Sequence, residues 1–74
     1  MSSRTYLLSR AAECQRLTSE EVDDVRQLAL ALLRDMWIAL AQESERMKPQ
    51  ALAEEIAAIE RIQSGLSPAG ETAH

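Results

Sequence analysis

Cysteine, histidine, glycine and proline are all scarce in this 74-residue chain, which holds one cysteine, one histidine, two glycines and two prolines. With Cys14 alone, an internal disulfide is excluded, and a lone thiol is consistent with a reducing cytoplasm. The histidine is the last residue, His74, so no His/Cys cluster has the spacing of metal ligands. We therefore expect no metal, no other cofactor and a cytoplasmic location.

The sequence also lacks the motifs of common enzymes. It contains no Gly-rich phosphate loop and no Ser/His/Asp set. Cys14 lies on an apolar line of the first expected helix, next to the acidic Glu13. Nucleophilic cysteines favour a cationic or helix N-terminal environment, so a buried structural cysteine is the better interpretation. Glu54 and Glu55 are adjacent and point to different faces of a helix, which excludes a catalytic pair. We expect no catalytic residues and no enzymatic activity.

Acidic residues outnumber basic ones by 12 to 8, giving a net charge of −4. This balance argues against a nucleic-acid partner held through phosphates. The charge is uneven: residues 1–17 carry three arginines against Glu13, a balance of +2, which leaves −6 for the rest. The apolar runs are short and Arg34 and Asp35 interrupt the longest helix, which excludes a membrane span. No secretory signal pattern is present.

The spacing of apolar residues predicts an all-α fold with a helical hairpin, a third helix and a long central helix. The expected helices cover about 3–17, 19–47 and 49–64 of a single domain over residues 1–66, followed by a disordered tail over 67–74.

The expected helix ends carry recognisable signals. Thr18 and Glu21 fit a capping box at the start of the second helix, and Ser19 is a second cap candidate. Pro49 cannot continue that helix and suits the first position of the third. Gly65 suits the end of the third helix.

The stretch 22–41 is apolar around most of its circumference. One broad face holds Val22, Val25, Leu28, Ala29, Leu32, Leu33, Met36, Ala39 and Leu40. Leu30, Trp37 and Ala41 form a second line about a quarter-turn away. Such a wide arc needs burial from several directions, and we expect the two shorter helices of the chain to leave the second line uncovered.

These features predict an oligomeric helical bundle. A helix over 19–47 would be about 40 Å long, and short connections place the other helices antiparallel to it, with Arg16 near its acidic start. The third helix folds back on its own chain or reaches another protomer; the sequence leaves both open. A chain this short has a marginal core. We therefore predict a homodimer, or a higher even-numbered oligomer, with these interface candidates: Leu30, Leu33, Met36, Trp37, Leu40 and Ala41.

Two strings resemble those of a recurrent bacterial type. The matching positions are Tyr6, Ala11, Glu13, Cys14, Arg16 and Leu17, then Trp37, Leu40 and Ala41. The pattern Tyr…Ala-x-Glu-Cys-x-Arg-Leu…Trp-x-x-Leu-Ala is similar to that of uncharacterised small helical proteins of alphaproteobacteria, with the tyrosine one residue further from the alanine. The resemblance covers about residues 6–41 and implies an intracellular bacterial helical hairpin without an assigned activity. It also suggests that Glu13, Cys14 and Arg16 act together.

The function expected from these features is a non-enzymatic protein–protein interaction or self-association module. The alternative is a small accessory transcriptional regulator or adaptor that acts through a protein partner. Direct DNA binding fits less well, because the second and third helices are acidic.

Overall fold

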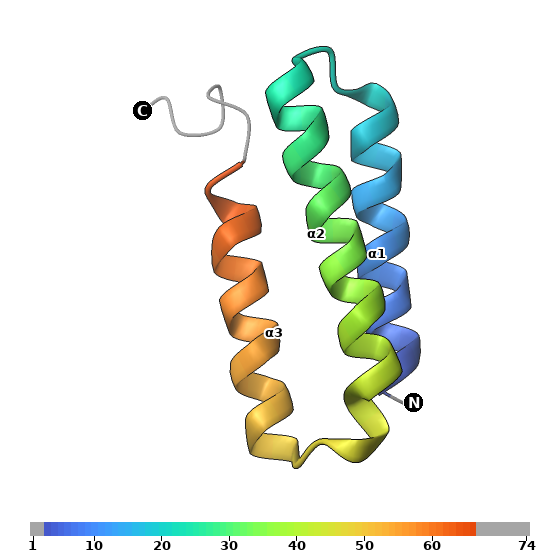
Figure 1. Ribbon diagram of the computed structural model, residues 1–74, viewed down its shortest axis with the longest axis vertical. Helices are drawn as coiled ribbons and strands as arrows, with labels where there is room; N and C mark the ends of the chain where they lie inside the picture. Colours follow the sequence, from blue (N-terminus) through green and yellow to red (C-terminus); the bar gives the residue numbers. More distant parts are fainter. Residues whose placement is uncertain (1–2, 67–74) are drawn as a thin grey trace.

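The computed structural model describes residues 3–66, which form three α-helices and one short 3-10 helix. They are α1 (Ser3–Glu20), α2 (Asp24–Glu43), η1 (Ser44–Arg46) and α3 (Pro49–Ser64). α1 and α2 form an antiparallel hairpin, and α3 runs back beside it (Figure 1). The predicted all-α, three-helix fold is confirmed. The tail predicted over 67–74 lies outside the described residues.

The junction between α1 and α2 differs from the prediction. α1 continues through Thr18 and Ser19, whose hydroxyls donate to main-chain carbonyls one turn back, at 2.8 and 3.2 Å. The N-cap of α2 is Asp23, which accepts a hydrogen bond from the Arg26 N–H at 2.9 Å. Serine and threonine hydroxyls can bond within a helix as well as cap one. Asp23 has extended backbone, and its carboxylate accepts from the first turn of α2.

The central helix is shorter than predicted. α2 has 20 residues, and its end tightens into the 3-10 turn η1, in which the buried Ser44 hydroxyl donates to the Ala41 carbonyl at 2.9 Å. Met47 and Lys48 are extended, and Pro49 opens α3. The prediction that Pro49 starts the third helix is confirmed. The predicted helix over 19–47 is wrong at both ends, because the connection takes residues 21–23 and η1 takes 44–46.

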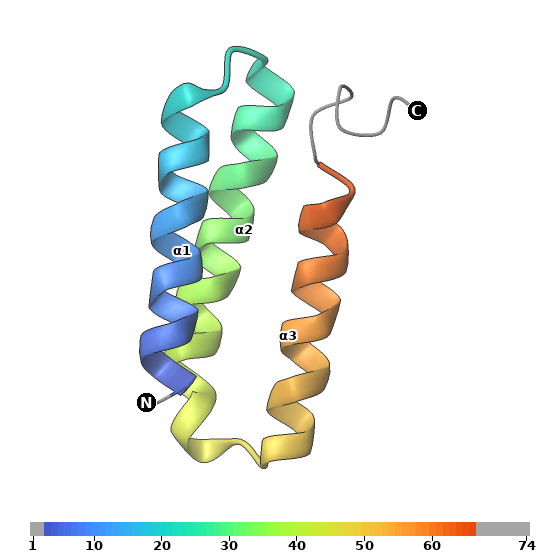
Figure 2. The ribbon, with the colours of Figure 1, turned by 180° about the vertical axis from the view of Figure 1, so that it is seen from behind.

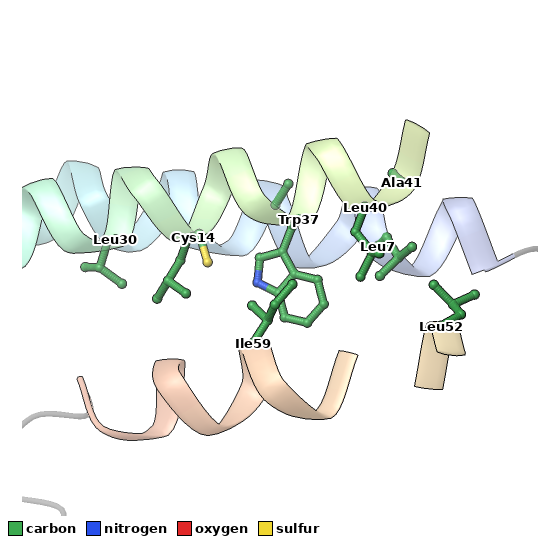
Figure 3. Close-up of a cluster of buried hydrophobic side chains, with 10 residues drawn as sticks. Leu7, Cys14, Leu30, Trp37, Leu40, Ala41, Leu52 and Ile59 are labelled. Carbon is green, nitrogen blue, oxygen red and sulfur yellow. The ribbon is translucent and has the colours of Figure 1, made fainter. Parts of the chain in front are cut away.

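The core lies along the seam where all three helices meet. Its buried apolar residues are Leu7, Ala11, Cys14, Leu30, Leu33, Trp37, Leu40, Ala41, Leu52 and Ile59. The Trp37 ring extends from α2 towards α3 and lies beside Ile59 (Figure 3). Trp37 is 0 % exposed, so one large aromatic side chain fills the centre of the bundle.

The third helix packs on its own chain, which settles the two placements left open by the sequence. Leu52 and Ile59 of α3 are buried against the hairpin. At the far end of α3, the Arg26 guanidinium donates to the Leu66 carbonyl. The view from behind shows the same order of helices, with α3 beside α2 (Figure 2). α3 therefore closes one side of the α2 seam within a single protomer.

Candidate functional site

One face of α2 remains apolar and exposed. Val25 is 75 % exposed, Leu28 63 %, Leu32 55 % and Met36 39 %. Ala29 and Ala39 lie on the same line at helical spacing, half-buried and exposed respectively. We call these six residues the α2 stripe. Val22, just before the N-cap, is 93 % exposed. Single exposed apolar residues are ordinary, but a contiguous row of them marks an interaction surface.

A shallow groove of about 340 Å³ lies between the C-terminal half of the α2 stripe and α3. Its lining consists of Met36, Ala39, Leu40, Glu43, Met47, Glu55 and Ile59. Ile62, 51 % exposed, lies three residues beyond Ile59 on the same side of α3. The stripe and the groove thus form one apolar surface with carboxylates at one end.

The structure buries the second line of α2 and leaves much of its broad face exposed, except at Leu33 and Leu40. The expectation that the chain leaves its second line uncovered is wrong, because Leu30, Trp37 and Ala41 are at most 5 % exposed. The shortened α2 is matched in length by α1 and α3, which together cover this side. Among the interface candidates, Leu33 and Leu40 are also buried in the protomer, and Met36 is exposed. The exposed large apolar residues of α2 lie on the broad face instead.

A polar group in the core joins all three helices. The Gln63 Oε1 atom of α3 accepts hydrogen bonds from Trp37 Nε1 at 3.2 Å and from the Arg10 guanidinium at 3.4 Å. The Cys14 thiol lies 3.7 Å from the same oxygen. One amide oxygen therefore satisfies donors from α1 and α2. Sequence reasoning missed Gln63, although its position four residues after Ile59 places it on the inner side of α3.

Arg10 lies between the buried tryptophan and an acidic residue of α3. Its guanidinium carbon is 5.1 Å from the centre of the Trp37 ring, within the range of a cation–π interaction. It also approaches the Glu60 carboxylate at 4.0 Å. The Tyr6 hydroxyl donates to Glu60 at 2.8 Å, and this hydrogen bond is the main cause of the raised pKa of Tyr6. These contacts attach α3 to α1.

Cys14 has the environment of a structural residue. Its side chain is 0 % exposed, and burial raises the pKa of its thiol. A raised pKa keeps the thiol protonated near neutral pH, whereas nucleophilic attack requires the thiolate. The interpretation of Cys14 as a buried core residue agrees with this geometry.

Glu13 and Arg16, which the sequence pattern groups with Cys14, form a surface ion pair on α1. Arg16 contacts Glu13 and also Glu20, the latter at 2.9 Å. The hydrogen bond from Arg16 lowers the pKa of Glu13. Arg16 therefore pairs within α1, whereas Arg26 contacts Glu21 of the connection, at 3.4 Å. Exposed pairs of this kind contribute little to stability.

Within residues 3–66, no group of three or more metal-ligating side chains is assembled, and no helix is long and apolar enough to cross a membrane. The α2 stripe with its groove is therefore the candidate functional surface of the described chain. Comparisons with protein-family models, curated proteins and solved structures found no match to the chain.

Proposed function

We propose that this protein is a non-enzymatic self-association module that pairs through the α2 stripe. The observation that carries the proposal is the row Val25, Leu28, Leu32 and Met36, each at least 39 % exposed on one side of a helix. Burying such side chains stabilises an assembly by roughly 25 cal/mol per Å² of apolar area before the costs of association.

The small core of the described residues supports the same conclusion. It holds ten buried apolar residues within 3–66, three of which are Ala11, Cys14 and Ala41. Small domains without disulfides or metals commonly gain stability by oligomerisation. The alternative function, an adaptor or accessory regulator, would use the same surface for a different protein.

The experiment measures oligomeric mass and tests the stripe directly. Sedimentation equilibrium at micromolar concentration is expected to give twice the monomer mass for the wild type. Leu32→Glu places a charge in the middle of the stripe and is expected to give the monomer mass with unchanged helical circular dichroism. Leu32 is 55 % exposed, so the substitution leaves the core intact.

The matched control is Ala57→Glu, which adds the same charge at an exposed position of α3 outside the groove lining. It is expected to retain the dimer mass. A monomeric wild type at these concentrations would overturn the proposed self-association. Trp37→Glu is no substitute for Leu32→Glu, because Trp37 is 0 % exposed and its replacement would disrupt the fold.

A further inference from the structure

We infer that the partner of the α2 stripe is a second copy of this chain, with the two α2 helices antiparallel about a two-fold axis level with Leu30 and Ala31. The inference rests on the proposed self-association and adds its geometry. It follows from the order of residues along the stripe, from the separation of the two acidic clusters at the start of α2 and from the position of the groove.

The stripe has the spacing of a helix-pairing seam. Val25, Ala29, Leu32, Met36 and Ala39 are separated by four, three, four and three residues. This alternation averages 3.5 residues and keeps one line of side chains facing a partner helix.

An antiparallel match makes the seam complementary to itself. When Val25 of one copy lies level with Met36 of the other, Ala29 lies level with Leu32. In an antiparallel pair, a step of four residues forward along one helix is a step of four residues back along the other. Each layer then contains at least one large residue: the layer of Val25 and Met36 has two, and the layer of Ala29 and Leu32 joins a small side chain to a large one. A two-fold interface requires such reciprocal pairs.

A parallel match fills the seam poorly. Identical residues then meet, so Ala29 faces Ala29 and Ala39 faces Ala39, leaving two layers without a large side chain. The next seam position, Glu43, would face its own copy across an apolar interface. Packed interfaces tolerate neither empty layers nor close like charges.

The repulsion between the two acidic clusters at the start of α2 is weaker in the antiparallel orientation than in the parallel one. Glu20, Glu21, Asp23 and Asp24 cluster around the α1–α2 connection. A parallel pair would place the two clusters side by side. In the antiparallel pair they are separated by about 17 residues of helix, or about 25 Å, which exceeds the Debye length of about 8 Å at physiological salt.

The groove between α2 and α3 receives the most exposed part of the second copy. In this register, Val25 of the second copy arrives at Met36 and Val22 arrives at Ala39. Met36 and Ala39 both line the groove. Val22 and Val25 are the two most exposed large apolar residues described, at 93 % and 75 %. Val22 and Val25 of each copy thus lie level with the groove of the other copy, and the two-fold axis repeats this contact.

Disulfide cross-linking tests the register. Disulfides require Cα atoms within about 7 Å, and Cys14 is 0 % exposed and therefore protected. Single variants Val25→Cys and Met36→Cys are purified, mixed and oxidised with diamide, and the products are identified by mass spectrometry. The mixture is expected to yield mostly the mixed Val25→Cys/Met36→Cys dimer, and each variant alone mostly uncross-linked monomer.

Ala57→Cys, exposed and outside the groove lining, is the matched control and is expected to cross-link less than the mixed pair. Preferential Val25→Cys homodimers would overturn the antiparallel register in favour of a parallel one. If all the cysteine variants cross-link equally while sedimentation gives the dimer mass, the register is overturned and the proposed self-association stands. A monomer mass for the wild type would instead remove the proposed function on which the inference rests.

Discussion

The Trp37 indole donates its hydrogen bond to Gln63 across the α2–α3 seam, at 3.2 Å from Nε1 to Oε1. The same oxygen accepts from Arg10, so a single side chain of α3 holds polar groups of both hairpin helices. A buried donor that loses its acceptor costs more than the hydrogen bond itself contributed. The attachment of α3 to the hairpin therefore depends on Gln63, although the Gln63 side chain is only partly buried.

Replacing Gln63 by Met keeps an unbranched side chain and removes this acceptor. The free energy of unfolding is expected to fall by about 1–3 kcal/mol, because Trp37 Nε1 is left without its partner. Urea unfolding followed by tryptophan fluorescence measures the change. The exposed neighbour Ser64→Ala serves as control, with an expected change within about 0.5 kcal/mol. Equal effects of the two substitutions would contradict the role of Gln63.

The cap of α2 predicts unequal losses of stability for substitutions of Asp23 and Thr18. Asp23→Ala is expected to lower the free energy of unfolding by about 0.5–2 kcal/mol, the usual value of an N-cap. Thr18→Ala is expected to cost less, because the Thr18 hydroxyl bonds to a carbonyl within α1. Thermal unfolding of the two variants compares them, and a larger loss for Thr18→Ala would restore the capping box predicted from sequence.

Neighbouring leucines of α2 separate folding from association. Leu33 is 2 % exposed and Leu32 is 55 % exposed. Leu33→Ala is expected to lower the free energy of unfolding by about 2–5 kcal/mol at every protein concentration. Leu32→Ala is expected to weaken the dimer, so its main effect is on how the unfolding midpoint changes with concentration. Urea titrations at several concentrations measure both, and identical behaviour of the two variants would contradict the assignment.

Stability is expected to fall in alkali because of Cys14. Burial raises the pKa of its thiol above the ordinary 9.0. Above that pH the unfolded chain loses the thiol proton while the folded chain keeps it, so the unfolded state binds fewer protons. The free energy of unfolding therefore falls as pH rises, and the stabilisation that the buried thiol provides is fully present only below pH 9.

Urea unfolding between pH 7 and 10.5 tests this, with Cys14→Ala as the reference that lacks the thiol. The advantage of the wild type over Cys14→Ala is expected to shrink above pH 9. An advantage that stays constant over this range would show that the thiol ionises alike in both states.

Much of the fold could be predicted from the sequence, and the misassignments have local causes. Pro49 is unambiguous because it lacks an N–H, and it does begin α3. Thr18 and Asp23 are both good caps, and only the path of the backbone selects Asp23. The apolar width of α2 was visible, but which of its faces is covered depends on where α1 and α3 pack. Helical periodicity does not encode that choice, so the sequence alone predicts Trp37 at an interface, whereas the structure buries it in the core.

The burial pattern also divides the molecule into parts of unequal strength. Of the ten buried apolar residues within 3–66, α3 contributes Leu52 and Ile59, and the hairpin contributes the other eight. Regions with few buried contacts open locally at a lower free-energy cost than the global transition. Amide hydrogens of α3 are therefore expected to exchange with solvent sooner than those at the centre of α2. Each opening of α3 would expose Trp37, so the helix with the fewest buried residues controls access to the largest fully buried side chain of the core.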